Sequence, residues 1–395
     1  MSDRFVRTES VGWLSRLGES IKGVLVGLLF FFGSFPLLFW NEGRAVRRAQ
    51  DLEEGRGAVV EAQADTVDPS MEGRLVHLNG LAVTSETLAD PRLGVSAPPS
   101  SLRLRRSVEM YQWQEESRTR ESKNLGGGQT RRTTYTYRTE WSAAPIDASR
   151  FEERAGHENP PMPFESTTVE AHDARIGARR LDASHLTQLD TFVPLPVAPA
   201  AVPALAAFGR PVQPEGQGVF VGANLAAPQV GDLRVRWEVV PAGPASVLAA
   251  QRGDGFGAWR TPSGRELEAN VELGVASADQ MFGELEAGNA TLTWILRFVG
   301  WLLMFLGLNL IFRPLVTVAD VVPLLGNLIG AGFFLAALVL SIPLSLTTIA
   351  VGWIVYRPLV GAALLAVGLA IGFGFGALAR KRGRAKNEVR HAARG

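Results

Sequence analysis

The apolar residues of this chain are gathered into a few long runs, and this segregation constrains the fold more than any other sequence feature. Between residues 291 and 378 Asp320 is the only acidic residue, whereas residues 42–289 carry charges, Pro and Gly throughout. Another apolar run covers residues 24–40. Uncharged runs of about 17–25 residues are long enough for a helix to cross a bilayer. The sequence therefore predicts an integral membrane protein, although its overall hydrophobic content of 46% resembles that of a soluble protein.

The first run is predicted as an uncleaved membrane anchor over residues 21–40. A cleaved signal peptide is the alternative, but Asn-Glu-Gly-Arg follows the run in place of the small residues of a cleavage site. In the preceding residues 1–20, Val11, Leu14 and Leu17 recur every three or four positions, which indicates an interfacial helix in a cytoplasmic segment. A polar tail is the alternative for that segment.

The C-terminal apolar region is too long for one helix, and its prolines suggest where to divide it. The predicted segments are a span over 291–312, an interfacial or re-entrant connection over 313–330, spans over 331–356 and 358–378, and a basic cytoplasmic tail over 379–395. A further break at Pro343 would give five spans in the whole chain instead of four.

The distribution of basic residues favours four spans. Arg380, Lys381 and Arg382 follow the last run, and such clusters belong on the cytoplasmic side, as does Arg313. Four spans place all of these inside and residues 41–290 outside the cytoplasm. The predicted fold class is thus a polytopic α-helical membrane protein with four transmembrane helices and a large β-rich α+β extramembrane domain between helices 1 and 2.

Small and amphipathic residues predict how the spans pack and where they meet the headgroups. Glycines four positions apart let helix backbones approach closely, within or between subunits. The candidate packing and oligomerisation residues are Gly368, Gly372, Gly376, Gly326 and Gly330, and the candidate interface anchors are Trp40, Arg297, Arg313, Arg380, Lys381 and Arg382. Arg297 lies near the start of its span, so its side chain is expected to extend to the headgroups.

The polar region 41–290 shows the period-two pattern of β-strands. Tyr135, Tyr137 and Trp141 lie on one face of a segment whose other face is polar, and the segment 108–114 presents Tyr111 and Trp113 together. The two segments flank a charged, Gly-rich stretch. They are therefore predicted to form a long hairpin with aromatic cross-strand pairs.

The sequence lacks the motifs of common enzyme classes. The chain has 0 Cys, no two of its 5 His stand at metal-ligand spacing, and no nucleophile elbow, phosphate loop or dinucleotide fingerprint occurs. A net charge of +1 gives no basis for nucleic-acid binding. We therefore expect no catalytic residues, no metal and no cofactor, and a protein that is not an enzyme.

Several segments resemble the LUMA (transmembrane protein 43) family. They include FPLLFWNEGRAVRRA, VEMYQWQEE, TYRTEWSAAPIDASRF, VGDLRVRWEVVP and WLLMFLGLNLIFRPLVTVADVVPLLGNLIGAG, which follow one order along nearly the whole chain. The resemblance implies four spans, cytoplasmic termini and a membrane scaffold that self-associates. Animal members reside in the endoplasmic reticulum and inner nuclear membrane and bind lamins and emerin. The Ala/Gly/Arg-rich composition suits a bacterial member, in the inner membrane and without those partners.

The leading functional hypothesis is a non-enzymatic membrane scaffold that forms homo-oligomers and organises unknown protein partners in the lipid bilayer. A channel or lipid-handling protein is the alternative. Its support is a polar cluster near Pro343, formed by Ser341, Ser345, Thr347 and Thr348, with Asn309 nearby. A third hypothesis, an exoplasmic hydrolase, would need polar side chains that converge in a pocket.

Overall fold

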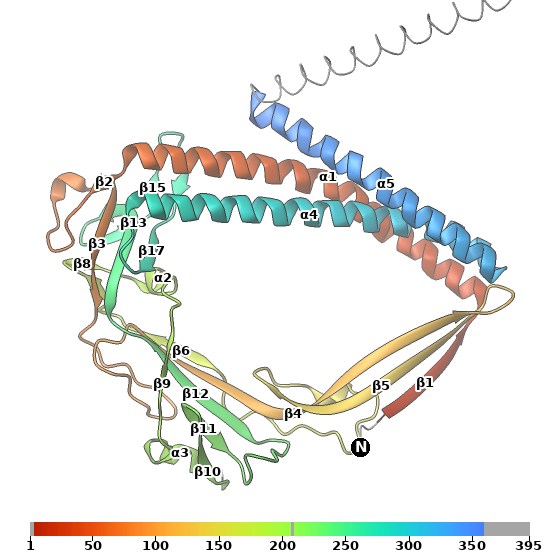
Figure 1. The fold of residues 1–395 in the computed structure, drawn as a ribbon, viewed down its shortest axis with the longest axis horizontal. Helices are drawn as coiled ribbons and strands as arrows, with labels where there is room; N and C mark the ends of the chain where they lie inside the picture. Colours follow the sequence, from red (N-terminus) through yellow and green to blue (C-terminus); the bar gives the residue numbers. More distant parts are fainter. Residues whose placement is uncertain (1–3, 207–208, 359–395) are drawn as a thin grey trace, which may run out of the picture. The chain divides into compact units, whose positions relative to one another are not determined.

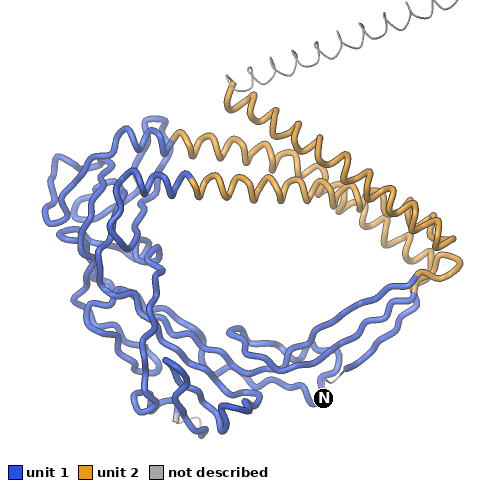
Figure 2. Tube along the Cα trace, viewed as in Figure 1, with its two compact units in different colours: residues 1–10, 51–122, 130–286 blue, residues 11–50, 123–129, 287–395 orange. Residues whose placement is uncertain are grey.

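The computed structural model describes residues 4–206 and 209–358, and the chain divides into two compact units. The first, here called the β unit, contains residues up to 10, 51–122 and 130–286. The second, the helical unit, contains residues 11–50, 123–129 and the described residues from 287 on. Figure 2 shows the β unit in blue and the helical unit in orange.

The larger sheet of the β unit has eight strands in the order β1-β5-β4-β12-β11-β10, with β6 beside β4 and β9 beside β12. These strands are β1 (Arg4–Val11), β4 (Arg103–Lys123), β5 (Gln129–Ser142), β6 (Thr167–Glu170), β9 (Val193–Leu195), β10 (Val212–Glu215), β11 (Gly218–Val221) and β12 (Leu233–Val240). The aromatic hairpin predicted from the sequence is confirmed, because β4 and β5 are neighbours and the rings of Tyr111 and Trp141 lie 5.1 Å apart.

The second sheet has seven strands in the order β14-β13-β3-β7-β8, with β17 beside β13 and β2 beside β3. They are β2 (Val60–Glu61), β3 (Leu75–Val83), β7 (Arg175–Ile176), β8 (Arg179–Arg180), β13 (Gly243–Arg252), β14 (Gly255–Gly257) and β17 (Asn270–Leu273). The remaining elements of this unit are the pair β15 (Trp259–Arg260) and β16 (Glu266–Leu267), helices α2 (Ala183–Leu186) and α3 (Pro203–Ala206), and the 3₁₀ turns Pro69–Met71, Ala148–Arg150 and Pro199–Ala201.

Buried apolar and more exposed polar side chains alternate along β12, and the buried ones contribute to the core of the β unit. In β12, Val235 and Trp237 are buried in the main hydrophobic cluster, while Arg236 between them is exposed. Strand β13 is buried on both faces from Ala245 to Gln251. Removing this apolar surface from water provides the main driving force for folding.

The helical unit is built from three long helices, α1 (Trp13–Ala58), α4 (Ala278–Ala319) and α5 (Pro323–Tyr356), which Figure 1 labels. Each contains a proline in its interior, at positions 36, 314 and 343 respectively. The last residues of α1 and the first of α4 belong to the β unit, so two helices continue without interruption from one unit into the other.

The prediction of four transmembrane helices is corrected by the structure. Within the described residues, three helices are long and apolar enough to cross a membrane, namely α1, α4 and α5. The fourth predicted span, 358–378, lies almost entirely outside the described residues, as do Gly368, Gly372 and Gly376. The structure therefore does not support the predicted fold with four transmembrane helices and the polar domain between helices 1 and 2.

Two segments differ locally from their predicted structure. Residues 4–11 form strand β1, and helix begins only at Trp13, because the sheet provides a neighbouring strand, β5, that a local sequence pattern cannot reveal. Residues 313–330 are helical except at Asp320–Val322. The break falls there because Pro323 lacks a backbone N–H and is suited to the first turn of a new helix.

Candidate functional site

One carboxylate joins all three long helices of the helical unit. Glu42 of α1 accepts hydrogen bonds from Nε and Nη2 of Arg297 of α4, at 2.7 and 2.8 Å. It also accepts one from Nε1 of Trp353 of α5, at 2.7 Å. The side chains of Glu42 and Arg297 are only 2% and 15% exposed. A paired guanidinium and carboxylate in this forked geometry form one of the stronger polar contacts in proteins.

Two glycines leave space beside this ion pair, and aromatic rings pack around it. A Cβ on Gly352 would lie 3.0 Å from Cβ of Glu42, and one on Gly43 would lie 2.5 Å from the ring of Tyr356. The guanidinium of Arg297 also lies 4.7 Å from the ring centre of Trp294. The absence of side chains at the two glycines lets α1 and α5 approach closely where their polar groups meet.

Next to the ion pair, amide and hydroxyl groups extend the contact between α1 and α4. Nδ2 of Asn41 donates to the carbonyl oxygen of Thr293 at 3.1 Å. Arg44 donates to Oδ1 of Asn289 and to Oγ1 of Thr293, both at 2.9 Å. These contacts satisfy polar groups that would otherwise be costly in an apolar environment.

A second charged cluster surrounds Asp320, at the break between α4 and α5. Arg16 of α1 donates to its Oδ2 at 2.5 Å, and Lys123, at the end of β4, donates to its Oδ1 at 2.6 Å. Nearby, Nε1 of Trp13 donates to the carbonyl oxygen of Thr317 at 2.9 Å. Asp320 is 1% exposed, so two cations compensate one buried carboxylate.

Between the two charged clusters, α1 and α4 approach closely at Gly27 and Gly307. A Cβ on Gly27 would lie 2.9 Å from the carbonyl oxygen of Gly307, and one on Gly307 would lie 2.6 Å from the backbone N of Phe31. Any larger side chain at either position would force the two backbones apart. This glycine pair was not among the predicted packing residues, because Gly27 and Gly307 lie on different helices.

The predicted site residues that the structure describes have varied surroundings. Trp40 is 51% exposed and Arg313 is also exposed, and Arg297 contacts Glu42. Gly326 and Gly330 face Asp320 and Val316 of the same chain. The remaining anchors, Arg380, Lys381 and Arg382, lie outside the described residues.

The polar side chains near Pro343 form hydrogen bonds within their own helix. The hydroxyls of Ser341, Ser345, Thr347 and Thr348 each donate to a carbonyl oxygen three or four residues earlier in α5. Asn309 donates in the same way within α4. Such contacts satisfy hydroxyl groups within a single apolar helix. These side chains therefore give no specific support for a channel.

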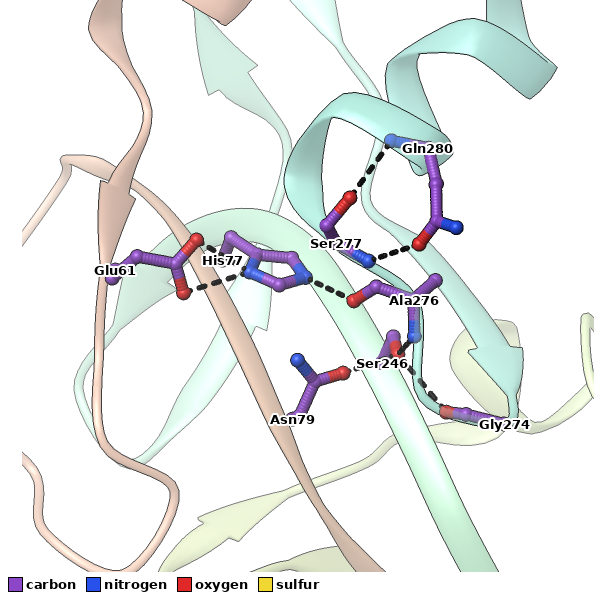
Figure 3. Close-up of polar contacts among 8 residues, drawn as sticks. All are labelled: Glu61, His77, Asn79, Ser246, Gly274, Ala276, Ser277 and Gln280. Atoms are coloured by element: carbon purple, nitrogen blue, oxygen red, sulfur yellow. Dashed lines mark hydrogen bonds and ion pairs between the residues drawn. The ribbon is translucent and has the colours of Figure 1, made fainter.

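The β unit contains a polar network around His77 and Ser246, shown in Figure 3. Nδ1 of His77 faces the carboxylate of Glu61 at 2.9 Å, and its Nε2 faces the carbonyl oxygen of Ala276 at 3.0 Å. Ser246 donates to Asn79 and to the carbonyl oxygen of Gly274. The serine hydroxyl is therefore not bonded to the imidazole, and the three side chains lack the geometry of a Ser-His-acid triad.

The same network fixes the start of α4. The backbone N of Ala276 donates to Oγ of Ser246 at 2.8 Å. Oε1 of Gln280 accepts from the backbone N of Ser277 at 2.8 Å, and Oγ of Ser277 accepts from the backbone N of Gln280 at 3.3 Å (Figure 3). This reciprocal pair is a capping box, which satisfies backbone donors at a helix N-terminus. The role of the network is thus to attach α4 to strands β3 and β13.

A cavity of about 660 Å³ opens in the β unit beside α2 and is lined by residues that include His172, Arg180, His185, Arg252 and Asp254. Nδ1 of His185, in the cavity wall, lies 2.9 Å from Asp182, the residue that caps α2. Among the described residues, no group of three or more His, Asp or Glu side chains is placed to hold a metal ion.

Three apolar helices joined to a unit with two large β-sheets define the class of this chain as a membrane protein with a large polar domain. The family model of transmembrane protein 43 matches residues 110–358. The chain is 38% identical to transmembrane protein 43 of Homo sapiens over 93% of its length and 92% of that protein, and 38% identical to the Rattus norvegicus protein over 89% of each. The Drosophila melanogaster homolog is 30% identical over 90% of this chain and 95% of its own length.

The chain therefore belongs to the transmembrane protein 43 family, as the sequence resemblance predicted. This family is not known as an enzyme family. No solved structure matches the chain significantly.

Proposed function

We propose that the protein is a membrane scaffold that links a lipid-embedded helical unit to a polar platform for other proteins. The observation that carries this proposal is the continuity of α1 and α4, 46 and 42 residues long, each of which contributes to both compact units. Buried charge pairs and glycine contacts hold the helices together, and the polar residues of these contacts bind one another.

The scaffold assembles with copies of itself. Within a single chain, only 17%, 28% and 17% of the most apolar windows of α1, α4 and α5 are buried. In α5 the exposed side chains include Leu328 at 71%, Phe334 at 53% and Val339 at 59%. In this proposal one part of that surface contacts lipid and another part contacts a second copy. Self-association would repeat the β unit along the membrane and create a multivalent platform.

Mass measurement in detergent together with crosslinking in native membranes tests self-association. The expected result is a discrete oligomer by light scattering and the same species after crosslinking. Phe334→Ser should reduce its amount, whereas Leu125→Ser, at an exposed position of the β4–β5 loop, should not. A monomer by both methods would overturn the proposal.

The cell location is part of the same proposal. The Ala/Gly/Arg-rich composition supports a bacterial inner membrane, without the nuclear-envelope partners of animal members. Fractionation of cells that express the full chain should recover it with inner-membrane markers after alkaline extraction. Recovery in the soluble fraction would contradict this location.

A further inference from the structure

The hairpin of β4 and β5 presents two faces within the β unit. On one face, the hydroxyls of Thr119 and Thr133 lie 3.0 Å apart, and Nε of Arg131 donates to Oε1 of Glu121 at 3.1 Å. Successive side chains of a strand point to opposite faces of the sheet. The odd-numbered residues therefore share this face, and the even-numbered residues share the other. The same contacts set the register of the two strands.

The even-numbered face places two arginines opposite each other. In this register Arg120 of β4 lies across from Arg132 of β5. Like charges directly opposite each other destabilise a pair of strands. Charged residues often protect the open edge of a sheet, but β5 lies between β1 and β4 (Figure 1), so that role does not explain Arg132. The repulsion between the two guanidiniums therefore calls for another explanation.

A cavity of about 510 Å³ opens on the same face. Its lining comes from three strands of the β unit and consists of Arg4, Glu116, Arg118, Arg120, Arg132, Thr134 and Thr136. The carboxylate of Glu116 accepts hydrogen bonds from Nε and Nη2 of Arg118, at 2.9 and 2.8 Å. One of the four guanidiniums is thus paired inside the cavity.

The other polar groups of the cavity have unused donors. Within residues 4–206 and 209–358, no carboxylate lies at ion-pair distance from Arg4, Arg120 or Arg132. The hydroxyls of Thr134 and Thr136 form no hydrogen bond in that part of the chain either. The whole chain has 40 basic and 39 acidic residues, so this excess of positive charge is local.

These donors match the chemistry of phosphate. A guanidinium stays charged and forms two parallel hydrogen bonds with phosphate oxygens. A phosphate monoester has about 1.5–2 negative charges at pH 7 and three strong acceptor oxygens, so two such groups balance three guanidiniums. A carboxylate carries a single charge, and three of them would have to gather in the same space. The volume of the cavity is within the usual range of small-molecule sites, about 300–1,000 Å³.

We propose that Arg4, Arg120 and Arg132 bind a compound with phosphate monoester or polyphosphate groups, and that Thr134 and Thr136 donate hydrogen bonds to it. A free phosphate compound and the headgroup of a phosphomonoester lipid share this chemistry. The bound anion removes the repulsion between Arg120 and Arg132. The site lies within the β unit and does not depend on self-association.

Calorimetric titration of the full chain in a non-ionic detergent tests the site. Inorganic tripolyphosphate is the probe for free compounds, and short-chain phosphatidic acid is the probe for lipids. Short-chain phosphatidylserine is anionic but has no phosphate monoester, so it is the comparison. Saturable binding of tripolyphosphate or phosphatidic acid, tighter than that of phosphatidylserine, is the expected result, and the tighter of the two identifies the source. No saturable binding of either probe would overturn the proposal.

The double variant Arg120→Gln and Arg132→Gln should weaken binding by at least about tenfold, because charge-assisted hydrogen bonds are lost. Its melting temperature should not fall, since the substitutions remove a repulsion. The charge-matched control is Arg150→Gln with Arg236→Gln, at exposed positions elsewhere in the β unit, and it should bind like the natural chain. Equal weakening in both double variants would reduce the effect to overall charge and overturn the site.

A single variant tests the site without changing any charge. Thr134→Val should weaken binding by about two- to tenfold, as expected for the loss of one neutral hydrogen bond, whereas Thr134→Ser should retain it. Unchanged binding in Thr134→Val would remove the hydroxyl from the site. Tighter binding of a hexaglutamate peptide than of either phosphate probe would assign this face to an acidic protein segment and would also overturn the proposal.

Discussion

Arg297 and Glu42 are 255 residues apart in the sequence, yet two hydrogen bonds of 2.7 and 2.8 Å join the guanidinium of the first to the carboxylate of the second. Neither side chain has appreciable contact with solvent. A buried charge that loses its partner is strongly destabilising, whereas a complete pair is tolerated. The pair therefore selects one arrangement of α1 against α4.

Replacing Glu42 should destabilise the helical unit. Glu42→Gln leaves the Arg297 guanidinium without a counter-charge and should cost about 3–5 kcal/mol of unfolding free energy. Thermal unfolding in detergent, followed by circular dichroism, measures the effect. Arg313→Gln, at an exposed position of α4, the helix that carries Arg297, is the control and should change little. Replacing Glu42 and Arg297 together by Leu should restore much of the loss, and an additive loss in the double variant would contradict this account.

Removing the charge of Asp320 should release the β4–β5 loop. Asp320→Asn leaves Arg16 and Lys123 to repel each other without a common carboxylate. The expected result is faster trypsin cleavage at the basic residues of the hairpin, because the loop loses the contacts that hold it to the helices. Asp190→Asn, at an exposed position of the β unit, should leave the cleavage rate unchanged. Equal cleavage rates in all three proteins would argue against this role of Asp320.

The contact between α1 and α4 should not accept even one methyl group. In Gly27→Ala the new Cβ would lie 2.8 Å from Cβ of Leu310, so the helices must separate. Overpacking of this kind costs about 1–3 kcal/mol. Gly33→Ala on the same helix meets open space and should be neutral or slightly stabilising. Melting temperatures in one detergent distinguish the two variants. A similar melting temperature for both would show that the close approach of α1 and α4 does not contribute to stability.

Acidification should weaken the β unit through His185. Burial lowers the pKa of His185 below its ordinary value of 6.5, and the charge of Asp182 only partly opposes this effect. The unfolded chain therefore binds a proton more readily than the folded one, so the free energy of unfolding should fall as the pH drops below about 6.5. Denaturant titrations at several pH values measure this slope.

His185→Gln should flatten that pH dependence, because the amide does not titrate but can still accept the hydrogen bond from the backbone N of Asp182 that the imidazole accepts now. His172→Gln is the control, since that side chain is 87% exposed. An unchanged slope in His185→Gln would assign the acid sensitivity to other groups.

Local patterns revealed the parts of this fold that depend on neighbouring residues. Runs without charge identified the apolar helices, and alternating aromatic residues identified β4 and β5, because the relevant periodicity lies within a few turns or residues. Strand β1 was missed because its partner β5 lies far along the chain and β1 alone has the composition of a polar tail.

The charged clusters could be predicted only in part. Arg297 is a charge near the start of an apolar run, which predicts a side chain at the headgroups, but its partner Glu42 flanks a different run. A search that pairs each such charge with opposite charges at the ends of other runs would have proposed Glu42. The role of Gly27 depends on the depth at which α1 and α4 cross, which a single sequence does not specify.

The bond between Ser246 and Asn79 has a consequence for how the protein is made. The two residues are separated by 167 positions, so β3 leaves the ribosome long before β13 exists to pair with it. At about 5–20 residues per second, this interval is roughly 10–30 s. During that time β3 has an open edge, and α1 is already available to enter a membrane. The nascent chain therefore presents an apolar helix to lipid before its largest domain can close, and a chaperone that covers strand edges would act in this interval.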